Sequence, residues 1–322
     1  MSAGIDAGCV RLKLAVANGK LAEAMVASDR PAVAQVLRGR PADDAIRLLP
    51  MLFALCGRAQ GRAAVLALDA ARGVECPLHL DAAIGQEVMR EHLWRWLLDL
   101  PPLLGKAPLQ TEFVTAAGCI AGGRRGDLLT MLGDPRIEAM CRRLNEAEDI
   151  TASRRTLLPG LSARDSLAHW PQLDAGFCRT PHWQGQAAET GALARRQAVS
   201  GPAAGAFAAR WLARLEELRE WAGGMERVGA GGTASAVPAG GQRGRALVET
   251  ARGLLMHEIV LDGGRIADYF IVAPTEWNFH PQGPLPDWLN GYDAGERQAV
   301  ETFAARAVAA LDPCVRWELE WL

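Results

Sequence analysis

The sequence contains no apolar stretch long enough to cross a membrane. A membrane-spanning helix needs ~20 consecutive apolar residues, and the most apolar region of this 322-residue chain, between Trp94 and Leu104, is interrupted by Arg95 and Asp99. The N-terminal residues also lack a basic region followed by an apolar one, which is the pattern of a secretory signal. We therefore expect a soluble, cytoplasmic protein that does not bind a membrane.

An excess of either charge is also lacking. The chain has 35 lysine and arginine residues against 37 aspartate and glutamate residues, which gives a formal net charge of −2. Electrostatic binding of nucleic acid requires a basic surface, so a nucleic-acid partner is not expected. Because 49% of the residues are hydrophobic, a chain of this length has enough apolar side chains for a large core.

Closely spaced cysteine pairs are missing as well, although the chain has seven cysteines. An odd number of unpaired cysteines is typical of reduced thiols in a cytosol. Cys76-x-x-His79 and Cys178-x-x-x-His182 have spacings seen in zinc sites, but neither has a second close pair to complete four ligands. The G-x-S-x-G nucleophile elbow and the H-E-x-x-H zinc helix are absent. The sequence therefore gives no support for a conventional hydrolase.

The order of apolar, charged and turn residues predicts a single, mostly α-helical domain with small β elements. Residues 1–28 are expected to contain a β-hairpin, because two apolar stretches flank an Asn-Gly pair, a strong turn signal. Residues 29–222 are expected to form a helical body, and residues 223–245 a glycine-rich loop. Residues 246–322 are expected to contain a second hairpin, a last helix and a tail that begins Asp-Pro-Cys.

Two cysteines stand at the ends of predicted helices. One helix is expected to begin at Asp43 and to end at Gly57, with Cys56 on its apolar face. Cys314 follows a helix predicted over residues 294–311, after a proline that stops this helix. A single cysteine is more often a packing residue than a ligand, and spacing alone does not indicate that these two meet.

Several segments match motifs of one known family in the same order. Glu249–His257 (ETARGLLMH) resembles E-x-P-R-G-x-L-x-H, and Gly263–Tyr269 (GGRIADY) resembles D/G-G-K-I-x-x-Y. Ala273–Phe279 (APTEWNF) resembles x-P-T-x-W-N-x, and Asp312–Cys314 resembles the start of D-P-C-x-x-C. Residues 38–57 resemble the segment that leads into R-x-C-G-x-C. These are motifs of the large subunit of nickel–iron hydrogenases, so the resemblance implies a shortened large-subunit-like fold.

The chain departs from this family at the residues that bind nickel. In the family, two C-x-x-C pairs supply four thiolates to a nickel–iron centre, whereas here the second cysteines are replaced by Ala59 and Trp317. The histidines expected shortly after the two pairs are replaced by Ala63 and Glu320. Two thiolates cannot build the usual nickel site. We therefore expect no nickel and no hydrogenase activity, and the chain is not expected to be an enzyme.

The combination of kept and lost residues resembles the HupK/HoxV class of hydrogenase maturation proteins. That resemblance implies a non-catalytic scaffold that holds iron, as an Fe(CN)2CO unit, between Cys56 and Cys314, because soft thiolates suit such an iron. Arg252, in the place of the family's active-site arginine, is expected to donate hydrogen bonds to the cyanide nitrogens. Three further residues are expected to orient the arginine loop and the chain end: Glu249, His257 and Asp312.

The same resemblance implies partners and leaves two questions open. The expected partners are hydrogenase maturation factors, among them a small iron-carrier chaperone, and the hydrogenase large subunit. The alternative is a metal-free mimic of the large subunit that acts as a chaperone or interaction protein in hydrogenase assembly. By motif position, Cys56 and Cys314 match the cysteines that bind nickel terminally. Either the iron moves toward these retained sulfurs, or the site is vestigial.

Overall fold

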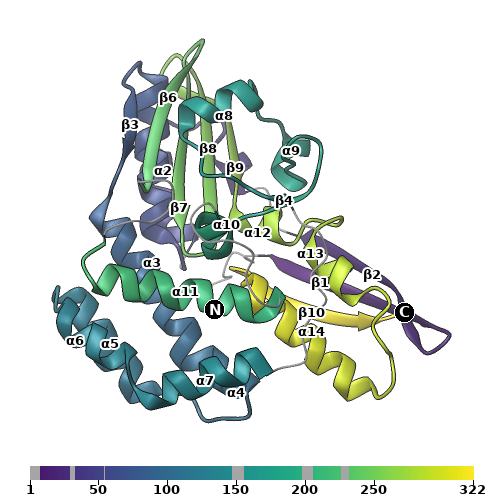
Figure 1. Ribbon diagram of the computed structural model, residues 1–322. Coiled ribbons are helices and arrows are strands. Elements are labelled where there is room, and N and C mark those ends of the chain that lie inside the picture. Colours follow the sequence, from purple (N-terminus) through teal and green to yellow (C-terminus); the bar gives the residue numbers. More distant parts are fainter. Residues whose placement is uncertain (1–7, 30–32, 54, 147–155, 198–205, 226–231) are drawn as a thin grey trace, which may run out of the picture.

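A five-stranded antiparallel sheet organises the upper part of the molecule (Figure 1). The computed structural model describes residues 8–29, 33–53, 55–146, 156–197, 206–225 and 232–322. In spatial order, the strands of the sheet are β3 (Cys76–His79), β6 (Ala234–Gly240), β7 (Arg243–Thr250), β8 (Gly253–Asp262) and β9 (Arg265–Val272). Strand β8 is buried along almost its whole length. A strand of this kind needs cover on both faces of its sheet.

Helices provide this cover. Helix α2 (Gly57–Ala71) packs on one face of the sheet, whereas α8 (Ala163–His169) and α9 (Ala175–Arg179) pack on the other. The backbones of α2 and β7 approach most closely at Gly244, where a Cβ atom would lie 2.1 Å from the amide nitrogen of Ala71. Because glycine has no Cβ atom, it permits this contact. Gly244 therefore allows α2 to lie directly on the sheet.

A second group of helices lies below the sheet in Figure 1, where the long helix α11 (Ala206–Ala222) crosses the molecule. Its indole Trp211 meets Trp96 edge to face, and the Nε1–H of Trp96 donates to the Trp211 carbonyl at 2.8 Å. Both side chains are fully buried. The other members of the group are α3 (Ala82–Trp94), the π-helical segment η2 (Arg95–Asp99), α4 (Leu100–Leu103), α5 (Gln110–Ala121), α6 (Arg125–Leu132) and α7 (Pro135–Glu146).

The two ends of the chain share a small three-stranded sheet. Strands β1 (Cys9–Ala17) and β2 (Lys20–Asp29) form an antiparallel hairpin, and β10 (Arg316–Trp321) pairs with β1 in parallel. The hairpin turn is Asn18-Gly19, and both residues have positive φ, as a type I′ turn requires. The last strand is thereby held against the start of the chain, next to helices α13 (Pro284–Leu289) and α14 (Arg297–Leu311).

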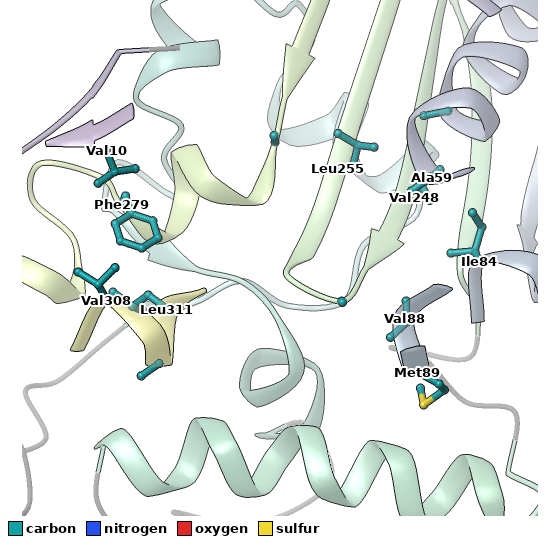
Figure 2. Packing of buried hydrophobic residues seen from close by; sticks show 14 of the residues in the cluster. Val10, Ala59, Ile84, Val88, Met89, Val248, Leu255, Phe279, Val308 and Leu311 are labelled. Atoms are coloured by element: carbon teal, nitrogen blue, oxygen red, sulfur yellow. The ribbon is translucent and has the colours of Figure 1, made fainter. Parts of the chain in front are cut away.

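A large apolar cluster joins α2 and the sheet to the lower helices and the small sheet, and a second, smaller cluster lies on the other face of the five-stranded sheet. Figure 2 shows Ala59, Ile84 and Val248 from the region of α2, α3 and β7, and Val308 and Phe279 from the region of α14 and the small sheet. The remaining elements are short, apart from α1: η1 (Val33–Leu37), α1 (Asp44–Leu52), β4 (Thr156–Leu157), β5 (Ala188–Glu189), α10 (Ala192–Gln197) and α12 (Pro274–Asn278).

The structure agrees with most of the predicted elements, and its largest difference lies in one region. Both hairpins are present, and the last helix covers Arg297–Leu311. The range 223–245, predicted as a glycine-rich loop, instead contains strand β6 and the beginning of β7. Its glycines serve a tight turn at Gly240-Gly241, where φ is positive, and the close approach at Gly244. The structure therefore contains more β-sheet than the small β elements that the sequence predicted.

Each helix of the described residues is too short or too polar to cross a bilayer.

Candidate functional site

Cys56 lies at the beginning of a helix and not at the end of one. Helix α1 ends at Leu52, and Cys56 is the residue that precedes the first turn of α2. The prediction of one helix that ends at Gly57 was therefore wrong. The reason is the contact between the two helices, because a Cβ atom on Gly57 would lie 3.0 Å from the carbonyl oxygen of Pro50. Gly57 thus permits a close crossing of two helices and does not terminate one.

The backbone around Cys56 is held by a carboxylate from α3. The backbone N–H groups of Arg58 and Ala59 donate to the two carboxylate oxygens of Glu87, at 3.0 and 3.1 Å. These are first-turn amides of α2 that have no partner within the helix. Ala59, which stands where the family has a cysteine, is completely buried. The start of α2 is therefore fixed, and the half-buried Cys56 directly precedes it.

Cys314 is positioned by the end of α14. Asp312 follows this helix in the left-handed conformation, with φ of 56°, and its amide still donates to the carbonyl of Val308 at 2.9 Å. Pro313 then prevents any continuation of the helix. Beyond it, the amide of Cys314 donates to the hydroxyl oxygen of Thr275 at 3.3 Å, and the Cys314 sulfur lies 3.0 Å from the same oxygen.

The motif segments of the C-terminal region meet at one asparagine. The side-chain amide of Asn278 donates to the carbonyl of Arg252, in the turn between β7 and β8, at 3.2 Å. It also donates to the carbonyl of Leu311, at the end of α14, at 3.4 Å. Its side-chain oxygen accepts from the amide of Thr190 at 2.9 Å. This residue links the arginine turn to the segment that carries Cys314, so the order of motifs in the sequence corresponds to one assembled site.

Cys56 and Cys314 line the same cavity. Its volume is about 1370 Å³, and the side chains of Arg95, Asp312 and Trp317 also contribute to its wall. Several other lining residues are apolar: Leu52, Phe53, Leu98, Leu103, Val308 and Ala309. The cavity therefore presents sulfur atoms to an interior that is partly apolar, with charged groups at its edge.

Buried charged side chains surround the end of helix α14. Arg252 donates from Nε to Asp312 at 3.2 Å and from Nη2 to Glu91 at 3.1 Å, and Arg95 pairs with Asp312 at 2.6 Å. Burial alone would raise the pKa of Asp312, but the guanidinium groups of Arg252, Arg95 and Arg214 outweigh burial and lower it to about 2. Asp312 is therefore a carboxylate at neutral pH and compensates three arginines.

Arg252 is near both cysteines but is not among the described residues that line the cavity. Burial would lower its pKa, yet the negative charges of Asp312 and Glu91, and then of Cys314 and Cys56, raise the pKa instead. The guanidinium is almost completely buried and does not face bulk solvent. Arg95 does line the cavity, and it is joined to Arg252 through Asp312.

Glu249 and His257, unlike Asp312, are not partners of Arg252 in the described hydrogen bonds. Glu249 pairs with Arg195 at 2.9 Å, and Arg195 also donates to the carbonyl of Thr250, beside the turn that carries Arg252. The described contacts of His257 lie elsewhere. Its ring nitrogens instead meet the hydroxyl of Tyr269 at 2.8 Å and the side-chain oxygen of Gln60 at 2.9 Å.

Among the described residues, no group of three or more histidine, cysteine, aspartate or glutamate side chains is arranged to hold a metal ion. The pair Cys76 and His79 is in contact, with Sγ 3.5 Å from Nδ1, but no third such ligand joins it. Cys178 lines the large cavity, and burial raises its pKa to about 12. A metal held by Cys56 and Cys314 would have to bring its other ligands with it.

Comparisons with known proteins agree with the sequence motifs. Residues 204–316 match the family model of nickel-dependent hydrogenases. The hydrogenase expression/formation protein HupK of Rhizobium leguminosarum bv. viciae is 30% identical over 98% of this chain and 97% of its own length. The hydrogenase expression/formation protein HoxV of Cupriavidus necator is 32% identical, with 92% of each chain covered. This chain belongs to the HupK/HoxV family.

The fold of this family member is that of a hydrogenase large subunit in shortened form. The nickel–iron–selenium hydrogenase of Desulfovibrio vulgaris Hildenborough superimposes with a TM-score of 0.63 at 16% identity, over 93% of this chain and 94% of that chain. The enzyme of Desulfomicrobium baculatum superimposes with a TM-score of 0.62 at 14% identity, over 94% and 95% of the two chains. At this identity the likeness concerns the fold alone.

Four residues around the site were missed in the sequence: Gln60, Glu91, Arg95 and Thr275. Gln60 follows Cys56 by four residues, and Arg95 follows Glu91 by four, so each pair shares one helix face. This spacing could have identified Gln60 once α2 was known to begin at Gly57. Glu91 and Arg95 reach the site only because α3 and η2 pack near the end of α14, which no local pattern indicates.

The stability of this family member should depend on pH through His257. Burial lowers the pKa of His257 to about 3, whereas an unfolded histidine titrates near pH 6.5, at about its ordinary value. Between about pH 3 and pH 6.5, the unfolded chain therefore binds a proton on His257 that the folded chain does not bind. Stability is complete above about pH 6.5 and falls by up to about 1.4 kcal/mol per pH unit as the pH decreases toward 3.

Urea denaturation of the wild-type and His257→Gln proteins at a series of pH values measures this contribution. We expect a shallower pH dependence in the variant, because glutamine does not titrate. His92 and His280, whose pKa values burial also lowers, are present in both proteins, so the difference in slope reports His257 alone. Equal slopes would show that the imidazole titrates normally in the folded chain.

Proposed function

We propose that this chain is a non-catalytic scaffold in nickel–iron hydrogenase maturation. It holds an Fe(CN)2CO unit between Cys56 and Cys314 and delivers this cargo to the hydrogenase large subunit. The observation that carries the proposal is that two cysteines, 258 residues apart (314 − 56), line one cavity. The names of the relatives, hydrogenase expression/formation proteins, support a role in maturation.

The chemistry of the two sulfurs suits this cargo. Thiolates are soft ligands that bind low-valent iron well. An iron that carries two cyanides and one carbonyl already has three ligands, so two sulfurs complete a five-coordinate unit. In the part of the chain that the structure describes, no group of three or more histidine, cysteine, aspartate or glutamate side chains is arranged to hold a metal, so the cargo would bring its other ligands. The carbonyl would lie against the apolar part of the wall, where no donor is needed.

The arginines supply donors for the cyanide nitrogens. A guanidinium offers five N–H groups in a fixed plane, and the described hydrogen bonds of the Arg252 guanidinium use Nε and Nη2. Arg95 lines the cavity beside Asp312 and offers a second set of charged donors. Asp312 positions both guanidinium groups. Glu249 supports the arginine turn through Arg195, and His257 supports the start of α2 through Gln60.

The proposal includes the absence of nickel and of catalysis. The second cysteine of each family pair is replaced, at one position by the buried Ala59 and at the other by Trp317, which lines the cavity. Tryptophan provides no thiolate and occupies more space than cysteine. Two sulfurs without the other pair favour iron alone. Because its cysteines are free thiols and its proposed task requires reduced sulfur, we place this protein in the cytoplasm.

The proposed partners follow from the direction of transfer. The cargo must arrive from a carrier, for which we propose a small iron-carrier chaperone, and must leave to the large subunit. At about 1370 Å³, the cavity is larger than a metal with three diatomic ligands requires. The cavity therefore has room for an exchange of ligands while the iron is transferred.

Infrared spectroscopy of protein purified without air tests this function. A scaffold loaded with cargo should show carbonyl and cyanide stretching bands, with about one iron per chain by elemental analysis and without nickel. Protein that supports hydrogenase maturation in cells but never contains iron, carbonyl or cyanide would instead be a metal-free mimic of the large subunit. Nickel in the purified protein, or hydrogen-dependent dye reduction, would contradict the proposal in a different way.

A further inference from the structure

The hydroxyl of Thr275 is oriented toward the sulfur of Cys314. The amide of Cys314 donates to Oγ1 of Thr275 at 3.3 Å, so this oxygen already acts as an acceptor. The sulfur lies 3.0 Å from the same oxygen. A thiolate has no proton to donate, so the threonine hydroxyl must be the donor in this contact when Cys314 is deprotonated. Thr275 is itself buried in α12, which limits its rotation.

Cys56 receives a comparable donor from Gln60. The side-chain Nε2 of Gln60 points to the Cys56 sulfur at 3.7 Å, within hydrogen-bonding range for sulfur. The other end of this amide is fixed, because its oxygen lies 2.9 Å from Nε2 of His257. An amide oxygen can only accept, so His257 carries its proton on Nε2. Its Nδ1 is then free to accept from the hydroxyl of Tyr269 at 2.8 Å.

These contacts form a chain of neutral donors from Tyr269 through His257 and Gln60 to Cys56. All three of these side chains are buried, and none carries a charge in this arrangement. The chain crosses from the sheet, where β8 and β9 carry His257 and Tyr269, to the first turn of α2. A buried chain of this kind fixes the direction of the last donor, since every other group in it is already paired.

We propose that Gln60 and Thr275 are positioning residues, each of which donates one neutral hydrogen bond to one of the two cargo-binding sulfurs. The inference rests on the proposed function but concerns this chain's own sulfurs before any cargo is bound. A neutral donor stabilises a thiolate and fixes its lone pairs without adding charge to the arginine cluster. Hydrogen bonds to a coordinating sulfur also reduce the electron density that this sulfur gives to iron.

The other cysteines differ in this respect. Among the described hydrogen bonds, the sulfurs of Cys9 and Cys76 meet carbonyl oxygens, and Cys76 also meets a histidine ring. Amide or hydroxyl side chains that face a sulfur occur in these contacts at Cys56 and Cys314. Cys178 lines the same cavity, and the group that faces it is the backbone of Ile271. The two donors thus coincide with the two retained motif cysteines and not with cysteines in general.

Alkylation by iodoacetamide, followed peptide by peptide with mass spectrometry, tests this inference in the full-length, metal-free protein at neutral pH. The Thr275→Val variant removes the hydroxyl at constant shape, and Thr275→Ser restores it. The Gln60→Met variant removes the amide at similar size. We expect Thr275→Val to slow alkylation of Cys314 about fivefold, and Gln60→Met to slow alkylation of Cys56 about fivefold, because a thiolate loses one donor.

The specificity of each effect decides the outcome. Each substitution should change its own cysteine and leave the other unchanged, and Thr275→Ser should return Cys314 to within a factor of about two of wild type. Tyr269→Phe, which removes one buried hydroxyl, should also slow the alkylation of Cys56. It provides a second test of the same chain of hydrogen bonds in case Gln60→Met does not fold. Unchanged rates at the paired cysteine, or equal changes at both cysteines, would overturn the inference.

A second measurement separates this inference from the proposed function. If the protein binds its cargo, Thr275→Val should move the carbonyl stretching band to lower frequency, because the sulfur then donates more electron density to iron. The alkylation result does not require iron. Selective slowing of alkylation in a protein that never binds iron would therefore support the two donors while contradicting the scaffold.

Discussion

Replacing either Cys56 or Cys314 by alanine is expected to abolish iron binding. Each variant loses one of two protein ligands, and the remaining sulfur cannot hold the cargo alone. Substitutions of residues that only support a metal ligand weaken metal binding by about 10- to 100-fold, so the loss of a ligand itself should exceed about 100-fold. Iron content and the carbonyl and cyanide infrared bands should fall to background in both variants.

The matched control is Cys178→Ala. This cysteine lines the same cavity, and its thiol has a pKa that burial raises to about 12, so it remains protonated at neutral pH. A protonated thiol is a poor metal ligand, and the variant should keep its iron. Circular dichroism should be unchanged in all three proteins, because Cys56 and Cys314 are only half-buried. Iron loss in all three variants would point to general damage of the cavity.

Maturation in cells provides the independent readout of the same substitutions. A strain that lacks this protein is complemented with each variant, and the activity of its hydrogenase is measured. A scaffold requires both sulfurs, so the Cys56→Ala and Cys314→Ala variants should fail to restore activity, whereas Cys178→Ala should succeed. Full activity with Cys56→Ala would favour a metal-free mimic, since such a protein needs its shape and not its thiols.

The hairpins and the turn that carries Cys314 could be predicted because their signals are local. Asn18-Gly19 requires positive φ at two consecutive residues, and few other pairs allow it. Pro313 stops α14 wherever the helix packs. The motifs around Arg252 and Asn278 depend on short-range turns at the ends of strands and helices, so they keep their sequence pattern even where the rest of the chain has changed.

The central sheet was underestimated because its signals are not local. Strand β3 pairs with β6 across 155 residues (234 − 79), and neither strand has a clear alternating pattern. The glycines near β6 and β7 suggested a loop, yet Gly244 is needed for contact with α2. The position of Cys56 was misjudged for a related reason. One helix was expected from Asp43 to Gly57, but two helices cross here, and Pro50 lies at their contact.

Some of the charged residues near the site, such as Glu91 and Arg95, could not be found from the sequence. Glu91 and Arg95 resemble an ordinary surface pair with helical spacing, and only the packing of α3 against the rest of the domain buries Glu91. Glu217 and Arg195 are separated by 22 residues and by residues outside the described part of the chain. When such a pair is buried, each charge needs its partner, because an uncompensated buried charge is strongly destabilising.

Replacing Arg195 by methionine is expected to cost more stability than any other single charge removal considered for this chain. Arg195 is almost fully buried and donates to both carboxylate oxygens of Glu217 at 2.8 Å and to Glu249 at 2.9 Å. Methionine fills similar space but leaves two carboxylates without this cation. Breaking a buried pair in this way costs about 3–5 kcal/mol, which should be measurable by urea denaturation at neutral pH.

The neighbouring Arg196 provides the control. It pairs with Glu216 and Glu220, whose side chains are more exposed than Glu217, so water replaces the lost interaction in Arg196→Met. Exposed pairs contribute about 0–1 kcal/mol, and the variant should stay close to wild type. A similar loss of stability in both variants would mean that burial does not increase the contribution of the ion pairs of Arg195.

Acidification should then rescue part of the Arg195→Met defect. Burial raises the pKa of Glu249 even while Arg195 is present, and removal of the cation must raise it further. Glu249 therefore becomes protonated at a higher pH than in the wild type, which removes one of the two uncompensated charges and reduces the stability difference from wild type. The double variant Arg195→Met/Glu249→Gln should show the same recovery at neutral pH. If the difference between Arg195→Met and wild type is instead constant with pH, the carboxylate of Glu249 is not the group that the arginine compensates.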